Sequence, residues 1–184
     1  MCTLRRSGYA MIEFITDREL YERVVLREIP AARKFLWIAT SDLKDMYVEK
    51  GRKAVPFLET ISELVGRNVS VRLIHAKEPG ANFRKDFDRY PNLIGGLERL
   101  LCPRVHFKAA VVDGRFAYTG SANITGAGMG AKSDRRRNFE SGIVTNDKQL
   151  IGHIMKQFDE IWMGARCGDC RRKEFCADYR EMLG

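Results

Sequence analysis

The sequence predicts an α/β fold in which helices cover a central sheet. Short apolar or alternating runs, typical of strands, take turns along the chain with stretches whose apolar residues recur at helical spacing. The 184-residue length fits one ordinary domain, and 45% of the residues are hydrophobic, which is enough for a real core. We find no internal repeat or low-complexity linker that would divide the chain.

The first half of the chain predicts two helices separated by a strand. Thr16 and Glu19 form a capping-box pair ahead of a helical apolar stripe. Residues 35–40 form a short apolar run, which indicates a buried strand. Apolar side chains within residues 57–65 share one helical face, and Gly66 is suited to end that helix.

The middle of the chain predicts three strands and an interrupted helix. Residues 69–73 alternate apolar and polar side chains, as a strand does. Residues 82–101 predict a helical zone that Pro91 interrupts. Residues 105–112 and 115–119 predict two strands joined by a tight turn, because an Asp-Gly pair stands between them.

The last predicted elements are a strand over residues 139–144 and an amphipathic helix that closes at Gly164. The remaining stretch is short and rich in cysteine. We therefore divide the chain into a catalytic domain over residues 1–164 and a Cys-rich tail over residues 165–184.

The charge balance favours a polyanionic partner. The chain has 32 basic and 24 acidic residues, a formal charge of +8; nucleic acid is the first candidate and anionic lipid the second. Many soluble proteins are also basic. No segment approaches the ~20 apolar residues of a membrane span, so we expect no stable membrane insertion. Residues 1–17 lack the apolar core of a secretory signal, and we expect a cytoplasmic protein.

The chemistry-bearing segment is residues 105–125. On a strand, His106 and Lys108 would share one face, so an imidazole and an ammonium would project together. Such a pair suits phosphate chemistry. Gly120 would allow the backbone to approach a ligand closely, and Asn123 could donate an amide hydrogen bond to a phosphate oxygen.

This segment resembles the phospholipase D signature, His-x-Lys, four residues, Asp, six residues, Gly-Ser-x-Asn. Six positions match at the fixed spacing: His106, Lys108, Asp113, Gly120, Ser121 and Asn123. The resemblance is to the short, nuclease-like members that carry a single motif. It implies a phospholipase D-like α/β/α sandwich around a central mixed sheet.

The resemblance also implies a mechanism. His106 would attack phosphorus and form a phosphohistidine, while Lys108 and Asn123 stabilise the equatorial oxygens. Glu140 looks like the family's trailing acidic residue, which orients the histidine, although a strand-edge charge is the alternative. The short members supply the second catalytic histidine by pairing two chains, so a homodimer is expected, and this chemistry requires no divalent cation.

Two motif residues have less certain roles. Asp113 begins an Asp-Gly turn, and we expect it to be structural or orienting rather than a proton donor. Ser121 could bond either the phosphate or the backbone.

A basic run follows the motif at Lys132, Arg135, Arg136 and Arg137. It could be an ordinary solvated loop. It is also well placed to hold a nucleic-acid backbone through phosphate contacts, and we favour that role slightly.

The tail holds a possible metal site. Cys167, Cys170 and Cys176 form the pattern C-x2-C-x5-C. Two thiolates separated by only two residues can coordinate the same metal ion. Cys102 is the best candidate for a fourth ligand, with Cys2 or a histidine as alternatives. Zinc and a [4Fe–4S] cluster both fit a structural site of this kind, and three free thiols on a loose tail would be the simplest alternative.

The motif identifies the bond that is cleaved and leaves the substrate open. The leading hypothesis is an endonuclease that acts on DNA or RNA. A phospholipase that acts on anionic lipid is the second. A nucleic-acid-binding subunit with an intact but idle motif is the third.

Overall fold

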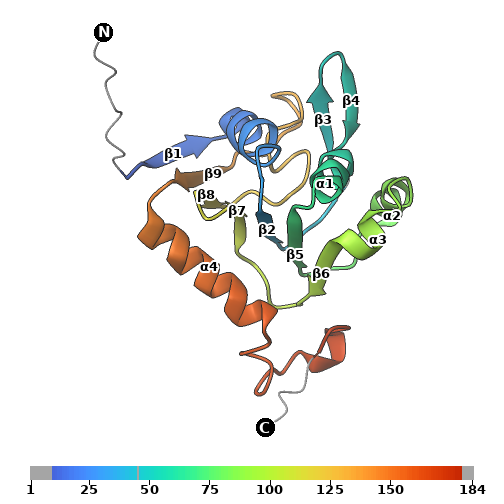
Figure 1. Cartoon of the computed structure of the whole chain (residues 1–184), viewed down its shortest axis with the longest axis vertical. Coiled ribbons are helices and arrows are strands. Elements are labelled where there is room, and N and C mark those ends of the chain that lie inside the picture. Colours follow the sequence, from blue (N-terminus) through green and yellow to red (C-terminus); the bar gives the residue numbers. More distant parts are fainter. Residues whose placement is uncertain (1–9, 45, 180–184) are drawn as a thin grey trace.

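A seven-stranded mixed sheet forms the middle layer of this computed structural model, which describes residues 10–44 and 46–179 (Figure 1). Its strand order is β1-β9-β8-β7-β2-β5-β6. β2, β5 and β6 are parallel to one another, and the other neighbours are antiparallel. The strands are β1 (Ile12–Thr16), β2 (Phe35–Thr40), β5 (Ser70–His75), β6 (Leu97–Leu101), β7 (Lys108–Val112), β8 (Phe116–Gly120) and β9 (Ser141–Thr145).

Helices cover both faces of the sheet (Figure 1). Leu36 and Ile38 of β2 pack in the larger core cluster, with the π-helical segment η1 (Leu20–Glu28) and α1 (Phe57–Gly66). Ala39 faces the opposite side, in a cluster with Phe158 of α4 (Lys148–Trp162). Successive side chains of β2 therefore point to opposite faces of the sheet and pack against a helical layer on each face. The predicted α/β/α sandwich is confirmed.

Smaller elements complete the fold. α2 (Ala81–Phe87) and α3 (Leu93–Gly96) connect β5 to β6, and a hairpin of β3 (Tyr47–Lys50) and β4 (Lys53–Pro56) precedes α1. A short 3₁₀ turn, η2 (Lys173–Phe175), lies in the tail. Within the described ranges, no helix has the length and apolarity to cross a membrane.

Two predicted elements were wrong in part. The helical zone expected over residues 82–101 ends at Gly96, and Leu97–Leu101 is a strand that pairs in parallel with β5. Two successive glycines end the helix there, and sheet pairing then decides the conformation of a leucine-rich stretch that helical spacing also fits. The strand expected from residue 105 begins only at Lys108, so His106 lies in a loop.

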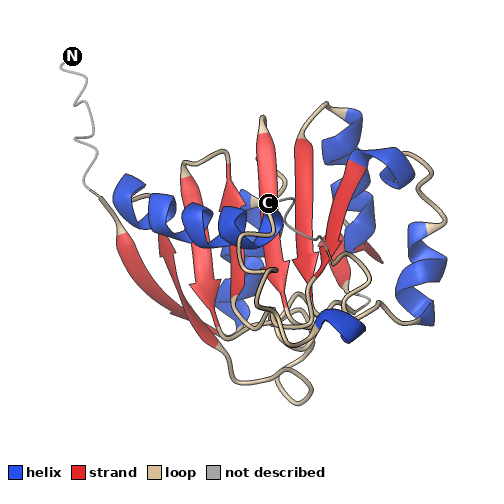
Figure 2. Ribbon diagram, turned by 90° about the horizontal axis from the view of Figure 1, so that it is seen from below, coloured by secondary structure: helices blue, strands red, loops and turns tan. Residues whose placement is uncertain are grey.

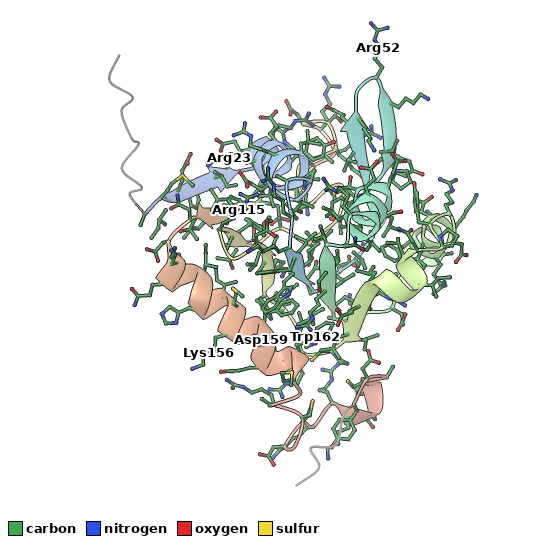
Figure 3. All side chains as sticks on the ribbon, in the orientation of Figure 1. Arg23, Arg52, Arg115, Lys156, Asp159 and Trp162 are labelled. Atoms are coloured by element: carbon green, nitrogen blue, oxygen red, sulfur yellow. The ribbon has the colours of Figure 1, made fainter. Side chains whose placement is uncertain are left out.

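Several sequence signals are confirmed. The Thr16 N–H donates to Glu19 Oε2 at 3.0 Å, which is one half of a capping box ahead of η1. Ion pairs then tie η1 to the sheet: Arg23 Nη2 lies 2.9 Å from a Glu13 carboxylate oxygen, and Arg115 Nη1 lies 2.7 Å from Glu28 Oε2 (Figure 3). β1 and the β3–β4 hairpin were not predicted. Residues 1–9, which include Cys2 and most of the segment judged not to be a secretory signal, lie outside the described residues.

Asp113 fastens the turn after β7 to the start of β2. Asp113 and Gly114 have positive φ angles of 54° and 63°, as a tight two-residue hairpin turn requires. The Asp113 carboxylate accepts hydrogen bonds from the backbone N–H groups of Arg33, Lys34 and Phe35 at 2.7–3.2 Å. Burial opposes ionisation of this carboxyl, but these three donors outweigh it and lower its pKa. The structural role expected for Asp113 agrees with these contacts.

We predict that Asp113→Ala lowers the free energy of unfolding by about 1–3 kcal/mol, because three backbone donors lose their acceptor. The matched control is Asp134→Ala, which removes an exposed ion pair with Arg137 and should cost less than about 1 kcal/mol. Denaturant unfolding of both variants at neutral pH is the measurement.

The pH dependence gives a second check. A carboxyl with a lowered folded pKa stabilises the fold above its unfolded pKa of about 3.9 and ceases to do so as the pH falls through the folded value. The difference between wild type and Asp113→Ala should therefore shrink in acid. An equal effect of the two substitutions at neutral pH would contradict the anchoring role.

Candidate active site

The motif residues other than Asp113 lie near one end of the sheet's strands, the end at which β2 and β5 finish. Figure 2 shows the long loops gathered at one end of the strands. The last residues of β2 and β5 are paired there, Thr40 with His75, so both parallel strands finish at this end. β7 starts at the same end, since its first residue, Lys108, pairs with Gly120 at the end of β8. Ligands of open α/β sheets bind at such carboxyl ends, which makes this end the natural location for a site.

His106 is exposed and lies in the irregular segment between β6 and β7. Lys108 is only 6% exposed, and its Nζ donates to the His106 backbone oxygen at 2.7 Å. The lysine therefore sits beneath the histidine and holds its main chain. This hydrogen bond joins the lysine side chain to the histidine main chain, and the two residues are not on one regular strand, in contrast to the expectation.

Asn123 connects the motif loop to the exit of β2. Its Oδ1 accepts from the backbone N–H groups of Ser41 and Asp42, both at 3.1 Å, and from the Ser41 hydroxyl at 2.7 Å. Thr40 Oγ1 lies 3.2 Å from the same oxygen. Backbone N–H groups can only donate, so this end of the amide must be the oxygen. The NH2 group has no partner among the described residues and is free to donate to a phosphate.

Ser121 and Glu140 are coupled to each other. The Ser121 hydroxyl donates a short hydrogen bond to Glu140 Oε2, and Glu140 Oε1 accepts from Asn138 Nδ2 at 3.0 Å. Within the described part of the chain, Glu140 makes no hydrogen bond to His106, so its histidine-orienting role stays a prediction. Ser121 also accepts from the Ser141 N–H at 3.1 Å, the backbone role that was one of its two alternatives.

Gly120 and Asp113 are both structural in this chain. A Cβ at Gly120 would collide with the Ser141 carbonyl and with Gly142 on β9, so close strand packing requires the glycine, rather than the ligand approach expected from the sequence. Asp113 follows the last residue of β7, five residues after Lys108. At ~3.3 Å per residue, this separates it by about 16 Å from the start of the strand, where the site lies. It is therefore outside the reaction centre.

The other two histidines do not supply a second catalytic group. His75 and Lys77 repeat the first spacing of the motif, but His75 is 2% exposed and its Nδ1 lies 2.8 Å from the Lys77 carbonyl oxygen. Burial lowers the His75 pKa and keeps the ring neutral. His153 is exposed on α4.

A groove of about 820 Å³ lies beside the motif loop. Asp42, whose N–H anchors Asn123, forms part of its wall. Asp42 and Glu78 are its acidic residues, and Asp42 is paired with Lys44 at 2.8 Å. The basic residues that line it come from three separate stretches of the chain: Lys44, Lys77, and Lys132 with Arg136 from one loop. Sequence reasoning missed the first two, although each follows a strand that ends at the site.

The basic run after the motif divides into two sets. Lys132 and Arg136 line the groove, as the phosphate-binding interpretation requires. Arg137 instead forms an ion pair with Asp134 at 2.6 Å. Arg135 is exposed and does not line the groove.

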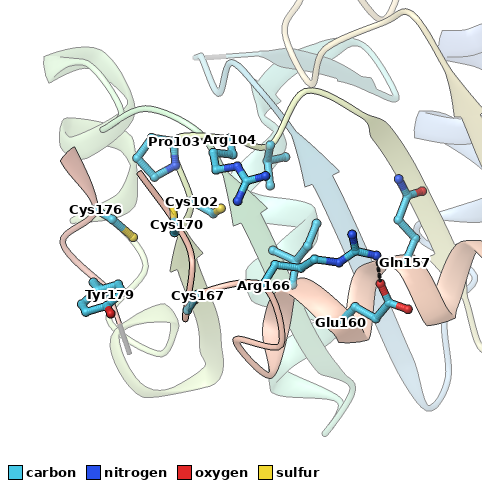
Figure 4. A pocket seen from close by; sticks show the side chains of 12 residues that line it. Cys102, Pro103, Arg104, Gln157, Glu160, Arg166, Cys167, Cys170, Cys176 and Tyr179 are labelled. Atoms are coloured by element: carbon cyan, nitrogen blue, oxygen red, sulfur yellow. Dashed lines mark hydrogen bonds and ion pairs between the residues drawn. The ribbon is translucent and has the colours of Figure 1, made fainter. Parts of the chain in front are cut away.

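The cysteines converge on a second pocket, next to the His106 loop (Figure 4). Cys102, Cys167, Cys170 and Cys176 all line it, and all four are half-buried free thiols. They surround a space of about 240 Å³. Across the described residues, no three His, Cys, Asp or Glu side chains are already arranged to hold a metal ion. The structure thus brings together the four predicted ligands without a preformed site.

Comparison with known sequences identifies the family. A family profile described as "Cardiolipin synthase, PLD-like domain" matches residues 25–162. The chain belongs to the phospholipase D-like family. The match covers the sandwich through the end of α4 and leaves the Cys-rich tail outside.

A curated relative, the mitochondrial cardiolipin hydrolase of Chlamydomonas reinhardtii, is 29% identical over 105 residues. The match covers 56% of this chain and 44% of the relative, so the chain spans less than half of that protein's length.

Solved structures share the phospholipase D-like fold. NucT from Helicobacter pylori has a TM-score of 0.61 at 17% identity, covering 84% of this chain and 97% of its own. Nuc from Salmonella typhimurium, a phospholipase D family member, has a TM-score of 0.60 at 17% identity, covering 84% and 95%. A phosphatidylserine synthase of Haemophilus influenzae matches over 84% of this chain and 39% of its own, with a TM-score of 0.58 at 17% identity.

Proposed function

We propose that this protein is a phosphodiesterase that hydrolyses nucleic acid through a phosphohistidine at His106. The observation that carries the proposal is the position of the cationic groove. Its wall at Asp42 is hydrogen-bonded to Asn123, so a strand lying in the groove would bring a phosphate to the motif loop. The exposed imidazole of His106 is accessible to such a phosphate.

The residues assign the steps. His106 attacks phosphorus, and a P–N bond forms while the P–O bond to the leaving group breaks. The leaving oxygen takes a proton from His106 of the partner subunit. That second ring then removes a proton from water, which attacks the phosphohistidine and restores His106. Lys108 and the Asn123 amide stabilise charge on the equatorial oxygens, so the reaction proceeds without a divalent cation.

The proposal includes a homodimer. The mechanism needs two histidines, whereas His75 is buried and His153 lies on α4. A two-fold axis that places His106 from each chain at one site meets this need. Any metal in the protein is bound by the cysteines and does not take part in hydrolysis.

A lipid substrate is the second candidate. The curated relative is a cardiolipin hydrolase, and cardiolipin carries phosphodiester bonds. The groove could accept a lipid phosphate through the same cations. Lys44 is paired with Asp42, and Glu78 also lines the groove. This leaves three basic residues of the groove without an ion pair among the described residues: Lys77, Lys132 and Arg136. Their spread over a groove of about 820 Å³ favours a polymer of phosphates over a single headgroup.

We predict that the purified protein cleaves nucleic acid in excess EDTA and that His106→Ala lowers the rate at least about a thousandfold. Labelled single-stranded DNA, duplex DNA, RNA and anionic phospholipid vesicles form the substrate panel. Binding of the cleaved substrate should persist in the variant, because the groove is unchanged. Cleavage of vesicles alone would favour the lipid candidate, and tight binding without any cleavage would favour an idle binding subunit.

We predict that Lys132→Ala combined with Arg136→Ala weakens nucleic-acid binding and lowers its salt slope by about one for each side chain removed. The matched control is Arg135→Ala, which removes a neighbouring charge that does not line the groove. Binding would be titrated at several salt concentrations. An equal effect of the control would show that only the overall charge matters.

We predict that excess His106→Ala protein suppresses wild-type activity after the two are mixed and allowed to exchange subunits. Each mixed dimer would hold one imidazole where the reaction needs two. Activity per wild-type chain is measured against the mixing ratio, and light scattering reports the dimer. Unchanged activity of a fully exchanged mixture would contradict the shared site.

A further inference from the structure

The cysteine pocket lies against the segment that carries His106. Cys102, Pro103, Arg104 and Val105 form one of its walls, directly before the catalytic histidine (Figure 4). The tail contributes the other three thiols, and Ile161 of α4 closes another side. The pocket thus joins the segment before His106 to the end of α4 and the tail, which are distant from that segment in sequence.

The tail is docked at this place by contacts of its own. Asp178 Oδ2 accepts from the Leu101 N–H at 2.7 Å, and the Cys176 thiol lies 3.4 Å from the Leu101 carbonyl oxygen. Both contacts are to the last residue of β6, one position before Cys102. The Asp178 contact, which needs no thiol proton, therefore holds the tail beside the end of β6, next to Cys102.

Three of the cysteines begin hydrogen-bonded turns. The Cys102 carbonyl accepts from Val105 N–H at 3.0 Å, Cys167 from Cys170 at 3.1 Å, and Cys176 from Tyr179 at 3.2 Å. The turn from Cys167 to Cys170 brings this Cys-x-x-Cys pair to the same pocket. Two thiols on one tight turn are the usual first half of a four-thiolate metal site.

We propose that Cys102, Cys167, Cys170 and Cys176 bind one thiophilic metal centre that fixes the loop of His106. Four thiolates satisfy either a tetrahedral zinc ion or a [4Fe–4S] cluster. The side chains now surround a space of about 240 Å³, and a metal would draw the sulfurs inward. Metal binding of this kind goes beyond the proposed hydrolysis and does not depend on it.

Positive side chains at the pocket suit this centre. Four thiolates exceed the charge of zinc or of the cluster, so the bound site is anionic. Arg104 and Arg166 line the pocket beside the cysteines, and Arg166 is also paired with Glu160 at 2.7 Å (Figure 4).

The consequence is a positioning role for the metal. The Cys102 N–H continues the pairing of β6 with β5, but residues 103–107 belong to neither β6 nor β7. Cys102 is four residues before His106, and a bond from its sulfur to a metal would tie this loop to the tail and to α4. This part of the inference rests on the proposed function, whereas metal binding itself can be tested without any substrate.

The test begins with the full chain purified anaerobically. Elemental analysis should find about one zinc or about four iron ions per chain, and an iron–sulfur cluster would add visible absorption. Cys→Ser at each of the four pocket positions should lose most of the metal. The matched control, Asp169→Ser, changes a tail residue between Cys167 and Cys170 that does not line the pocket, and it should keep the metal. Metal-free protein with four freely reactive thiols, or full metal retention in the pocket variants, would overturn the site.

A second measurement tests positioning. Metal removed from folded wild type by a chelator should increase hydrogen exchange in residues 102–107, while the core of α1 stays protected. In the same sample, kcat should fall by about ten- to a hundredfold, because His106 is no longer held in position. KM should change little, because the groove that binds the substrate is unaffected. Unchanged exchange in this loop would overturn the positioning role even if the metal is present. Absent hydrolysis in every sample would count against the proposed function and leave the metal result standing.

Discussion

The site depends on one side-chain oxygen, Asn123 Oδ1, which accepts hydrogen bonds from the loop that leaves β2. Two of these donors are backbone N–H groups, so the amide cannot turn over without losing both bonds. This constraint fixes the orientation of the amide and leaves its NH2 group without a partner among the described residues. It also fixes the distance between the motif loop and the groove wall at Asp42, because both are attached to the same atom. In the proposed mechanism, this oxygen would therefore hold the Asn123 amide and the groove wall in one arrangement.

The segment that carries His106 has rigid ends and an exposed ring. At one end, the Cys102 N–H donates to the His75 carbonyl at 2.8 Å, which continues the pairing of β6 with β5. At the other, the buried ammonium of Lys108 holds the His106 carbonyl. Val105, between them, is 3% exposed and packs with Phe158 of α4. A nucleophile needs both access to phosphorus and a restricted position, and the loop supplies access while its anchors supply restriction.

The sequence predicted the elements whose pattern has one interpretation. β2 is apolar throughout, α4 has a clear helical stripe, and the Asp-Gly turn defines the hairpin of β7 and β8. β6 was wrong because the spacing of its leucines fits a helix equally well, and only the neighbouring strand decides between them. Lys44 and Lys77 were missed for a related reason: nothing local marks a lysine as part of a groove. Had β2 and β5 been predicted as parallel neighbours, the loops that follow them would have been expected side by side, and both lysines would have been candidates.

The arrangement of the groove and the motif also bears on the choice between polymer and lipid. A phospholipid offers one or two phosphodiesters at a membrane surface, which a few cations around the histidine would satisfy. Here basic residues from three stretches of the chain line a groove whose wall at Asp42 is hydrogen-bonded to Asn123. In the proposed homodimer, the two-fold axis would generate a second such groove leading to the same pair of histidines. Two cationic grooves that meet at one reaction centre match a chain of phosphates continuing on both sides of the scissile bond, and a single headgroup would leave most of that charge unused.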